Sequence, residues 1–287
     1  MAAASRASLA YNFLFTRGRA FRYGPQRSQT ADLHLPRGQG PHPVVVLIHG
    51  GSWRERYGKR VMRALAADLL ARGHAAWNIE YRRIGEGGGW PETFEDVAAA
   101  IDHLPTLEEP LDLGRVTVVG HSAGGHLALW AASRERLAPG APGATEGRPA
   151  VQLRDAVSMA GVCDLAGAFR DWKGGAALEL MGVSPERDRA RWAAADPRAL
   201  VPPAARILLI HGSNDEVVSV RLSRDYAAAA RAAGAEVELV ELAGHEGRHR
   251  AHVYPSGRAW RTAVRWITER SSADREGPQR PFTLGRS

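Results

Sequence analysis

Apolar runs of strand length alternate with stretches of helical spacing along most of this chain. The apolar runs cover residues 44–48, 75–79, 116–119, 156–160, 207–210 and 237–242. The helical stretches cover residues 60–71, 93–104, a segment beginning near 123, 222–233 and 258–268. Continuous apolar strands separated by helices are typical of a parallel sheet that is covered on both faces. We therefore predict an α/β fold with a mainly parallel sheet.

Ligands bind to such sheets beyond the carboxyl ends of the strands, so the loops that follow the apolar runs are where chemistry is expected. These loops are rich in polar side chains and glycine. They contain the segment from His49 to Trp53, residues 78–83, Ser122, the segment 211–215, and a last loop with His245, His249 and His252.

The loop after the run 116–119 reads Gly120-His121-Ser122-Ala123-Gly124 and leads directly into a helical segment. A serine between a strand and a helix, with a glycine two residues to either side, is typical of a strained turn that exposes a nucleophilic hydroxyl. The amide-rich start of the helix then faces that hydroxyl. We predict that Ser122 is a catalytic nucleophile.

A serine nucleophile needs a base, and the base needs an acid that orients it. Asp215 follows the run 207–210 and is the candidate acid; the alternative is that it caps the helix that begins near residue 220. The base must come from the last loop. His245 lies three residues and His249 seven residues beyond the run that ends at Leu242. The spacing alone leaves both histidines open.

The oxyanion of such a reaction requires backbone N–H donors. We expect one from Ala123, which follows the nucleophile, and others from Gly50 and Gly51 in the glycine loop after the first run. Trp53 and His121 are predicted to line the substrate pocket.

Taken together, these segments resemble the α/β-hydrolase superfamily, specifically its esterase- and lipase-like members with a His-Gly-Gly oxyanion loop. The resemblance is strongest to the feruloyl-esterase-like and kynurenine-formamidase-like group, and it extends from about Asp32 to Thr268. It depends on His49–Arg54, the segment 78–83, Gly88-Gly89-Trp90-Pro91 with Asp96 and Val97, the serine turn and the Asp215 segment. It implies an α/β-hydrolase fold with about eight strands.

The same resemblance bears on the choice of base. In such relatives the catalytic histidine is followed six positions later by proline, and Ala-Trp opens the last helix. Pro255, Ala259 and Trp260 fit this register only if His249 is the base, although Arg250 replaces the usual aromatic residue after it. We predict that His249 is the base, with His245 as the alternative.

The chain is predicted to form a hydrolase domain over residues 31–270, preceded by a basic extension over 1–30 and followed by a disordered tail over 271–287. Residues 165–200 have an irregular helical pattern. They are predicted to form a small lid inserted between two strands, or else an ordinary crossover connection.

The amino-acid composition of the chain argues against several classes of partner and cofactor. The formal net charge is +7, but only Lys59 and Lys173 are lysines and the arginines are dispersed, so we do not expect a nucleic-acid partner. No apolar stretch reaches the roughly 20 residues of a membrane span, so we expect no membrane partner. The single cysteine, Cys163, leaves no internal disulfide and no cysteine metal cluster. We expect no metal or cofactor, a cytoplasmic location, and a monomer or homodimer.

The function predicted from these residues is hydrolysis of a small carboxylic ester through an acyl-serine intermediate. The close alternative is hydrolysis of an aryl formamide by the same residues. A more distant alternative is a binding protein with a hydrolase fold and no catalysis.

Overall fold

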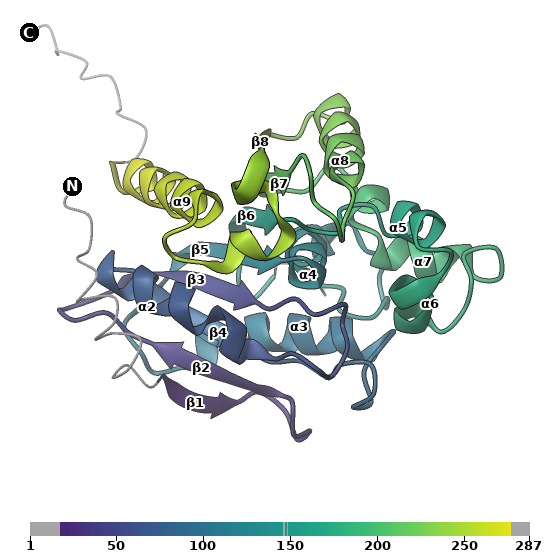
Figure 1. The fold of residues 1–287 in the computed structure, drawn as a ribbon. Helices are drawn as coiled ribbons and strands as arrows, with labels where there is room; N and C mark the ends of the chain where they lie inside the picture. Colours follow the sequence, from purple (N-terminus) through teal and green to yellow (C-terminus); the bar gives the residue numbers. More distant parts are fainter. Residues whose placement is uncertain (1–17, 146, 148, 277–287) are drawn as a thin grey trace, which may run out of the picture.

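The computed structural model describes residues 18–145, 147 and 149–276. As predicted, their backbone forms a mainly parallel sheet of eight strands, and the strand order is β1-β2-β4-β3-β5-β6-β7-β8 (Figure 1). The strands are β1 (Arg19–Arg22), β2 (Thr30–His34), β3 (His42–Ile48), β4 (Ala75–Ile79), β5 (Leu111–His121), β6 (Leu153–Met159), β7 (Arg206–Gly212) and β8 (Val237–Leu242). Six neighbouring strands are parallel, namely β4, β3, β5, β6, β7 and β8. Their carboxyl ends therefore all lie at the same end of the strands.

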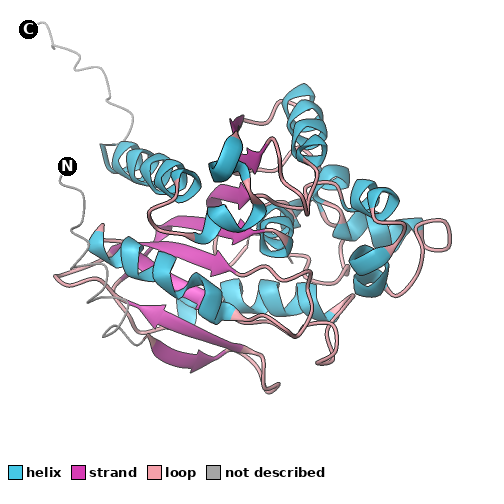
Figure 2. Cartoon of the chain, viewed as in Figure 1, coloured by secondary structure: helices cyan, strands magenta, loops and turns pink. Residues whose placement is uncertain are grey.

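Helices cover both faces of the sheet, which Figure 2 shows as a single twisted layer. The α-helices are α2 (Arg63–Ala71), α3 (Glu92–Asp102), α4 (Ala123–Ala131), α5 (Leu165–Asp171), α6 (Gly175–Met181), α7 (Arg189–Ala195), α8 (Val220–Ala232) and α9 (Arg258–Glu276). Apolar side chains of α2 and α9 pack with one face of the sheet, and those of α3, α4 and α8 pack with the other. This two-sided burial explains why β3 is buried along its whole length.

Two strands were not predicted from the sequence. β1 pairs antiparallel with β2, and β2 pairs antiparallel with β4, so together they extend one edge of the sheet. These strands are short and only partly apolar, because a strand with one solvent-facing side needs fewer apolar residues. Residues 19–22 therefore belong to the sheet and not to an N-terminal extension, which corrects the boundary at residue 30.

The two chain ends lie partly outside the described residues. Residues 1–17 of the expected basic extension and residues 277–287 of the expected tail are not described. The first part of that tail, residues 271–276, belongs to α9 instead. The helix thus continues beyond Thr268, where the apolar spacing of the sequence stops being informative.

The segment predicted as a lid forms α5, α6 and α7, followed by a short 3-10 helix over Pro197–Leu200. In Figure 1 these helices lie together at one end of the sheet. Asp196 connects the two ends of the insertion, since its carboxylate accepts hydrogen bonds from the amides of Leu165 and Ala166 at 3.0 and 3.1 Å. Burial raises the pKa of Asp196 to about 6, despite these amides.

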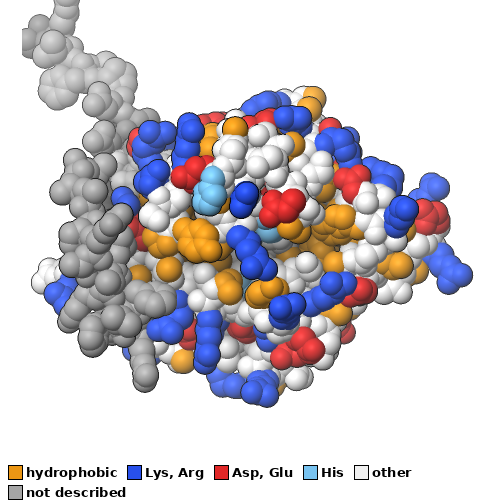
Figure 3. Space-filling view, in the orientation of Figure 1, with side chains coloured by type: hydrophobic (Ala, Val, Ile, Leu, Met, Phe, Trp, Pro, Cys, Tyr) orange, Lys and Arg blue, Asp and Glu red, His pale blue; other side chains and the backbone are white. Residues whose placement is uncertain are grey.

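Figure 3 shows lysine and arginine side chains scattered over one face of the molecule, with acidic side chains between them. Within the described part of the chain, no helix is both long enough and apolar enough to cross a membrane.

Candidate active site

Ser122 stands alone between β5, which ends at His121, and α4, which begins at Ala123. Its backbone has φ 55° and ψ −121°, a conformation that non-glycine residues rarely adopt. The Ser122 amide donates to the carbonyl of Met159 at 2.9 Å, so the neighbouring strand holds the turn in place. The turn therefore has the strained geometry that the sequence motif predicts.

The glycines at either end of this turn are required by close backbone approach. A Cβ atom at Gly120 would lie 1.9 Å from the carbonyl oxygen of Gly124. A Cβ atom at Gly124 would lie 2.1 Å from the carbonyl oxygen of Ile48, at the end of β3. Both contacts are far shorter than side-chain carbon atoms tolerate, so any larger residue would displace Ser122.

The glycine loop after β3 lies against the serine turn. A Cβ atom at Gly50 would meet the His121 carbonyl oxygen at 2.6 Å and Cβ of Ser122 at 3.0 Å. The amide of Ala123 belongs to the first turn of α4, where helices leave N–H groups without acceptors. Among the described residues, neither the Ala123 amide nor the Gly51 amide has a backbone acceptor. These amides are free to bind a substrate oxygen.

His49 holds this glycine loop from behind. Its Nδ1 lies 2.8 Å from the carbonyl oxygen of Gly50, and its Nε2 lies 2.6 Å from Oε1 of Glu80. The imidazole stacks on Tyr81 at a centroid distance of 4.4 Å, and the Tyr81 hydroxyl donates to the His49 carbonyl. Burial by itself raises the pKa of Glu80, but the hydrogen bond and charge of His49, the Lys59 amide and the charge of Arg83 together outweigh burial and lower the pKa. Glu80 therefore stays ionised and anchors the ring.

Asp215 and His249 form a direct pair. Nδ1 of His249 lies 2.8 Å from Oδ2 of Asp215, whose side chain is fully buried. The other carboxylate oxygen accepts from the amides of Val217 and Val218 at 2.8 and 2.9 Å. Burial opposes ionisation of Asp215, but hydrogen bonds from His211 and His249 lower its pKa well below the usual range. The carboxylate is thus charged and fixed in orientation.

Sequence reasoning missed a second histidine at this carboxylate. His211 at the end of β7 is fully buried, with Nε2 2.9 Å from the Val218 carbonyl and 3.5 Å from Oδ2 of Asp215. Its Nδ1 lies 2.7 Å from the Ser223 hydroxyl. The carbonyl requires a proton on Nε2, so Nδ1 accepts from Ser223. The only sequence signal was its position at the end of a strand, directly before the loop that carries Asp215.

The backbone of His249 is also held by histidines. Nε2 of His121 donates to the His249 carbonyl at 3.0 Å, and Nδ1 of His252 lies 3.2 Å from the same oxygen. Burial lowers the pKa of His121 to about 3, so this ring is neutral at ordinary pH. The loop after β8 is therefore fixed to the strand that carries Ser122.

One cavity of about 310 Å³ brings together the predicted nucleophile Ser122, the predicted base His249 and the glycine loop. It is lined by Gly50, Gly51, Ser52, Tyr57, Val61, His121, Ser122, Val217, His249, Arg250, Val253 and Tyr254. The predicted lining residue His121 is among them. His245 is not, since it lies exposed on the preceding turn. The structure thus pairs Asp215 with His249 and leaves the alternative histidine outside the pocket.

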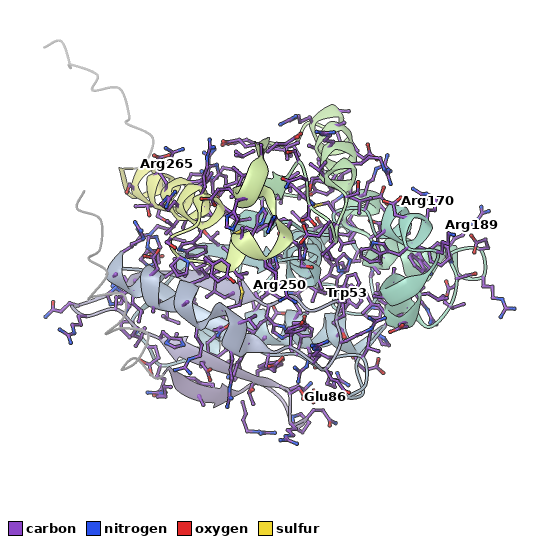
Figure 4. The ribbon with its side chains drawn as sticks, in the orientation of Figure 1. Trp53, Glu86, Arg170, Arg189, Arg250 and Arg265 are labelled. Carbon is purple, nitrogen blue, oxygen red and sulfur yellow. The ribbon has the colours of Figure 1, made fainter. Side chains whose placement is uncertain are left out.

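Trp53 was predicted to form a wall of this pocket, and that prediction is wrong. Its side chain is 1% exposed and packs edge-on against His126 of α4 at a centroid distance of 5.3 Å. Its backbone has φ 57°, and its indole, labelled in Figure 4, lies 6.4 Å from the ring of Trp172. A large apolar ring is more stable in this buried aromatic group than in an open pocket.

The predicted lid contributes no side chain to this cavity. Instead, Asp171 and Trp172 line a neighbouring cavity of about 270 Å³, which also contains Asp215 and Val217. The insertion is attached to the glycine loop through Arg54, whose guanidinium donates to Glu179 at 2.6 and 2.8 Å. The insertion therefore lies beside the serine pocket.

Several lining residues could not be found from the sequence. Tyr57 and Val61 follow the glycine loop, Val217 precedes α8, and Val253 and Tyr254 precede α9. Each lies in a loop or a short 3-10 helix of its own segment, and only the fold brings the segments together. Among the described residues, no group of three or more His, Cys, Asp or Glu side chains is arranged to hold a metal ion.

Comparison with known protein families gives a match over residues 31–229. The chain belongs to the BD-FAE family. This family consists of α/β-hydrolase esterases, which confirms the resemblance inferred from the His-Gly-Gly and serine motifs. The match includes β2 to α8 and so contains Ser122 and Asp215, whereas His249 lies beyond it.

Individual proteins similar to this BD-FAE chain include two curated relatives. One, from Oryza sativa subsp. japonica, is named "Probable isoprenylcysteine alpha-carbonyl methylesterase ICME" and is 28% identical over 85% of this chain. This chain spans 61% of that relative's length. The other is a kynurenine formamidase from Meyerozyma guilliermondii, 26% identical over 80% of this chain and 88% of its own.

Among solved structures, esterase B from Lactobacillus rhamnosus HN001 has the same fold. Its TM-score against this BD-FAE chain is 0.75 at 19% sequence identity, and the alignment covers 95% of this chain and 94% of the esterase. This likeness confirms the predicted α/β-hydrolase fold.

Proposed function

We propose that this protein hydrolyses small carboxylic esters through an acyl-serine intermediate. The observation that carries the proposal is the Asp215–His249 pair, at 2.8 Å, beside a cavity that contains both His249 and Ser122. A cavity of about 310 Å³ is near the lower end of the range for ligand sites, so it suits a small substrate.

The reaction begins when the Ser122 hydroxyl oxygen attacks the ester carbonyl carbon and its proton passes to Nε2 of His249. The amides of Ala123 and Gly51 stabilise the resulting oxyanion. Asp215 holds the proton-bearing Nδ1 of His249 and stabilises the imidazolium. His249 then donates its proton to the leaving alkoxide as the carbon–oxygen bond breaks. Water attacks the acyl group by the same route, which releases the acid and restores the Ser122 hydroxyl.

Labelling with a fluorophosphonate probe tests the catalytic serine. We expect the wild-type protein to be labelled and Ser122→Ala to be unlabelled, because the probe forms a covalent bond only with an activated serine. Ser213→Ala is a matched control, since Ser213 lies on an exposed loop near the site. A well-folded wild-type protein that takes no label would contradict the proposal and favour the binding protein without catalysis.

A second candidate function is the hydrolysis of an aryl formamide. The similarity to a kynurenine formamidase supports it, and the same residues suit a nitrogen leaving group. Turnover of 4-nitrophenyl esters of increasing acyl length, measured beside an aryl formamide such as N-formylaniline, separates the two. We expect the short esters to have the higher kcat/KM. A higher value for the formamide would assign the protein to the second function.

We also propose that the protein is located in the cytoplasm and that it is a monomer or a homodimer. Cys163 is a buried free thiol, which suits a reducing compartment. Cell fractionation tests the first proposal, and sedimentation of the purified protein tests the second.

A further inference from the structure

Arg250 occupies a position that none of the roles above requires. It lies on the short 3-10 helix His249–Val253, directly after the proposed base, and its side chain lines the serine cavity. Figure 4 labels it near the centre of the view. Arg250 directly follows His249 in the sequence and is exposed to solvent.

Among the residues that the structure describes, none is paired with the charge of Arg250. Within the described part of the chain, this guanidinium forms neither an ion pair nor a hydrogen bond, whereas exposed Arg221 and Arg224 both pair with carboxylates. Two acids near this loop have other partners: Glu246 lies four residues before Arg250, and Oε2 of Glu216 lies 3.5 Å from the backbone amide of His249. Oε2 of Glu246 accepts from the amide of Arg258 at 3.0 Å, and Glu216 lines the neighbouring cavity.

The rest of the described lining has no opposite charge. No aspartate or glutamate lines the serine cavity, and its larger side chains are apolar or aromatic. Of the four exposed large hydrophobic side chains among the described residues, three belong to this lining: Val61, Val217 and Tyr254. Exposed apolar side chains gathered at one place are typical of a binding surface. The cavity thus combines an apolar mouth with one unpaired cation.

We propose that Arg250 binds a carboxylate carried by the substrate, so that the preferred ester has an apolar part and an anionic group. This inference rests on the proposed ester hydrolysis and specifies its substrate class. A guanidinium binds carboxylates through two parallel N–H donors, which gives orientation as well as affinity. The carboxylate belongs either to the acyl part or to the alcohol part of the ester. In both cases Arg250 recognises it through the same guanidinium–carboxylate pair.

Two matched substrate pairs test the proposal. In the acyl pair, the mono-4-nitrophenyl ester of glutaric acid is compared with that of glutaric acid monoamide. In the alcohol pair, 4-butyryloxybenzoate is compared with 4-butyryloxybenzamide. Each pair differs only in replacement of a carboxylate by a neutral amide. The measured quantity is the ratio of kcat/KM for the anionic ester to kcat/KM for its neutral partner.

We expect Arg250→Gln to lower this ratio about fivefold in at least one pair, because an exposed guanidinium–carboxylate pair contributes an attraction of that size. Arg250→Glu should lower it further, since repulsion then replaces attraction. Added salt should lower the wild-type ratio by screening the exposed charge.

Arg248→Gln is the matched control. It removes the same charge from the same turn, but Arg248 does not line the cavity, so the ratio should stay at its wild-type value. Unchanged ratios in Arg250→Gln for both pairs, or equal falls in Arg248→Gln, would overturn the assignment. Turnover of the neutral esters by the wild-type protein separately tests ester hydrolysis itself, so failure of either idea can be recognised.

Discussion

Nδ1 of His249 lies 2.8 Å from Oδ2 of Asp215, although 34 positions separate the two residues in the sequence. β7 and β8 are adjacent parallel strands, with Gly212 opposite Leu242, so the loops after them emerge side by side. Each loop then returns a polar side chain toward the serine turn. The pair depends on strand order as much as on the residues themselves.

Replacing Asp215 by asparagine should lower kcat for a 4-nitrophenyl ester by about 10³–10⁴-fold. An amide nitrogen at the position of Oδ2 cannot accept the Nδ1 proton, so His249 adopts the wrong tautomer. Asp225→Asn on α8 is the matched control, because the partly exposed Asp225 pairs with Arg221 and does not line the serine cavity. We expect this control to have wild-type kcat. A comparable loss in both variants would indicate that the effect comes from folding.

Alanine substitutions at the two candidate bases should have opposite outcomes. His249→Ala removes the group that lines the serine cavity, and kcat should fall by several orders of magnitude. His245→Ala removes an exposed histidine of the preceding turn and should leave kcat within a factor of about two, as is usual for surface positions. Steady-state kinetics with a short-chain ester checks both. The assignment of His249 fails if only His245→Ala is inactive.

Glu80→Gln should lower kcat about tenfold with little change in KM. Glu80 does not touch the cavity but fixes His49, which in turn holds the Gly50 carbonyl. Its loss allows the oxyanion donors to move, and these act only in the transition state. A rise in KM with unchanged kcat would instead place Glu80 in substrate binding. Asp102→Asn, which weakens an ion pair with Arg134 elsewhere, is the control for general destabilisation.

Acid should destabilise this protein through its buried neutral histidines. Burial lowers the pKa of His126 to about 4, against about 6.5 in the unfolded chain. A lowered pKa in the folded state means that the contribution to stability is complete above pH 6.5 and is lost as the pH falls toward 4. Between pH 7 and pH 5 His126 should therefore account for a loss of about 2 kcal/mol in the free energy of unfolding.

His126→Gln tests this linkage, because glutamine keeps an N–H donor for the Ala195 carbonyl that Nε2 contacts at 2.9 Å. Urea unfolding at pH 7 and pH 5 gives the two free energies for each protein. The decrease between them should be smaller in the variant by about 2 kcal/mol. An equal decrease in the two proteins would show that His126 does not titrate on unfolding.

The main elements of the fold could be predicted from the sequence because their signals are local. The apolar run 44–48 is buried in β3, and the observed β8 has the predicted bounds of 237–242, although only its end residues Val237 and Leu242 are buried. The edge strand β1 and its neighbour β2 were missed, and Thr30–His34 of β2 carries too few apolar residues to stand out. Their pairing with each other and with β4 is a long-range contact, which no short window of sequence contains.

In the active site, too, some features follow from local sequence and others from long-range contacts. The turn from Gly120 to Gly124 could be identified from five residues, since backbone sterics at Ser122 demand glycine on both sides. The pocket walls could not, because Tyr57, Val217 and Tyr254 come from three separate loops. The direction of Trp53 was mispredicted for a related reason. Its partners His126 and Trp172 are distant in sequence, and burial among them decides where the indole points.

The sequence by itself determined how the parallel strands alternate with helices along the chain and where the strained serine turn lies, together with a short set of partners for Ser122. These follow from side-chain periodicity and from steric limits on a few consecutive residues. Only the tertiary structure decided between His245 and His249, which lie four residues apart in the same loop. The path of that loop is set by the hydrogen bond that His121 of β5 donates to the His249 carbonyl and by the bond that His249 donates to Asp215 in the loop after β7, and these hold His249 in the cavity and leave His245 in solvent.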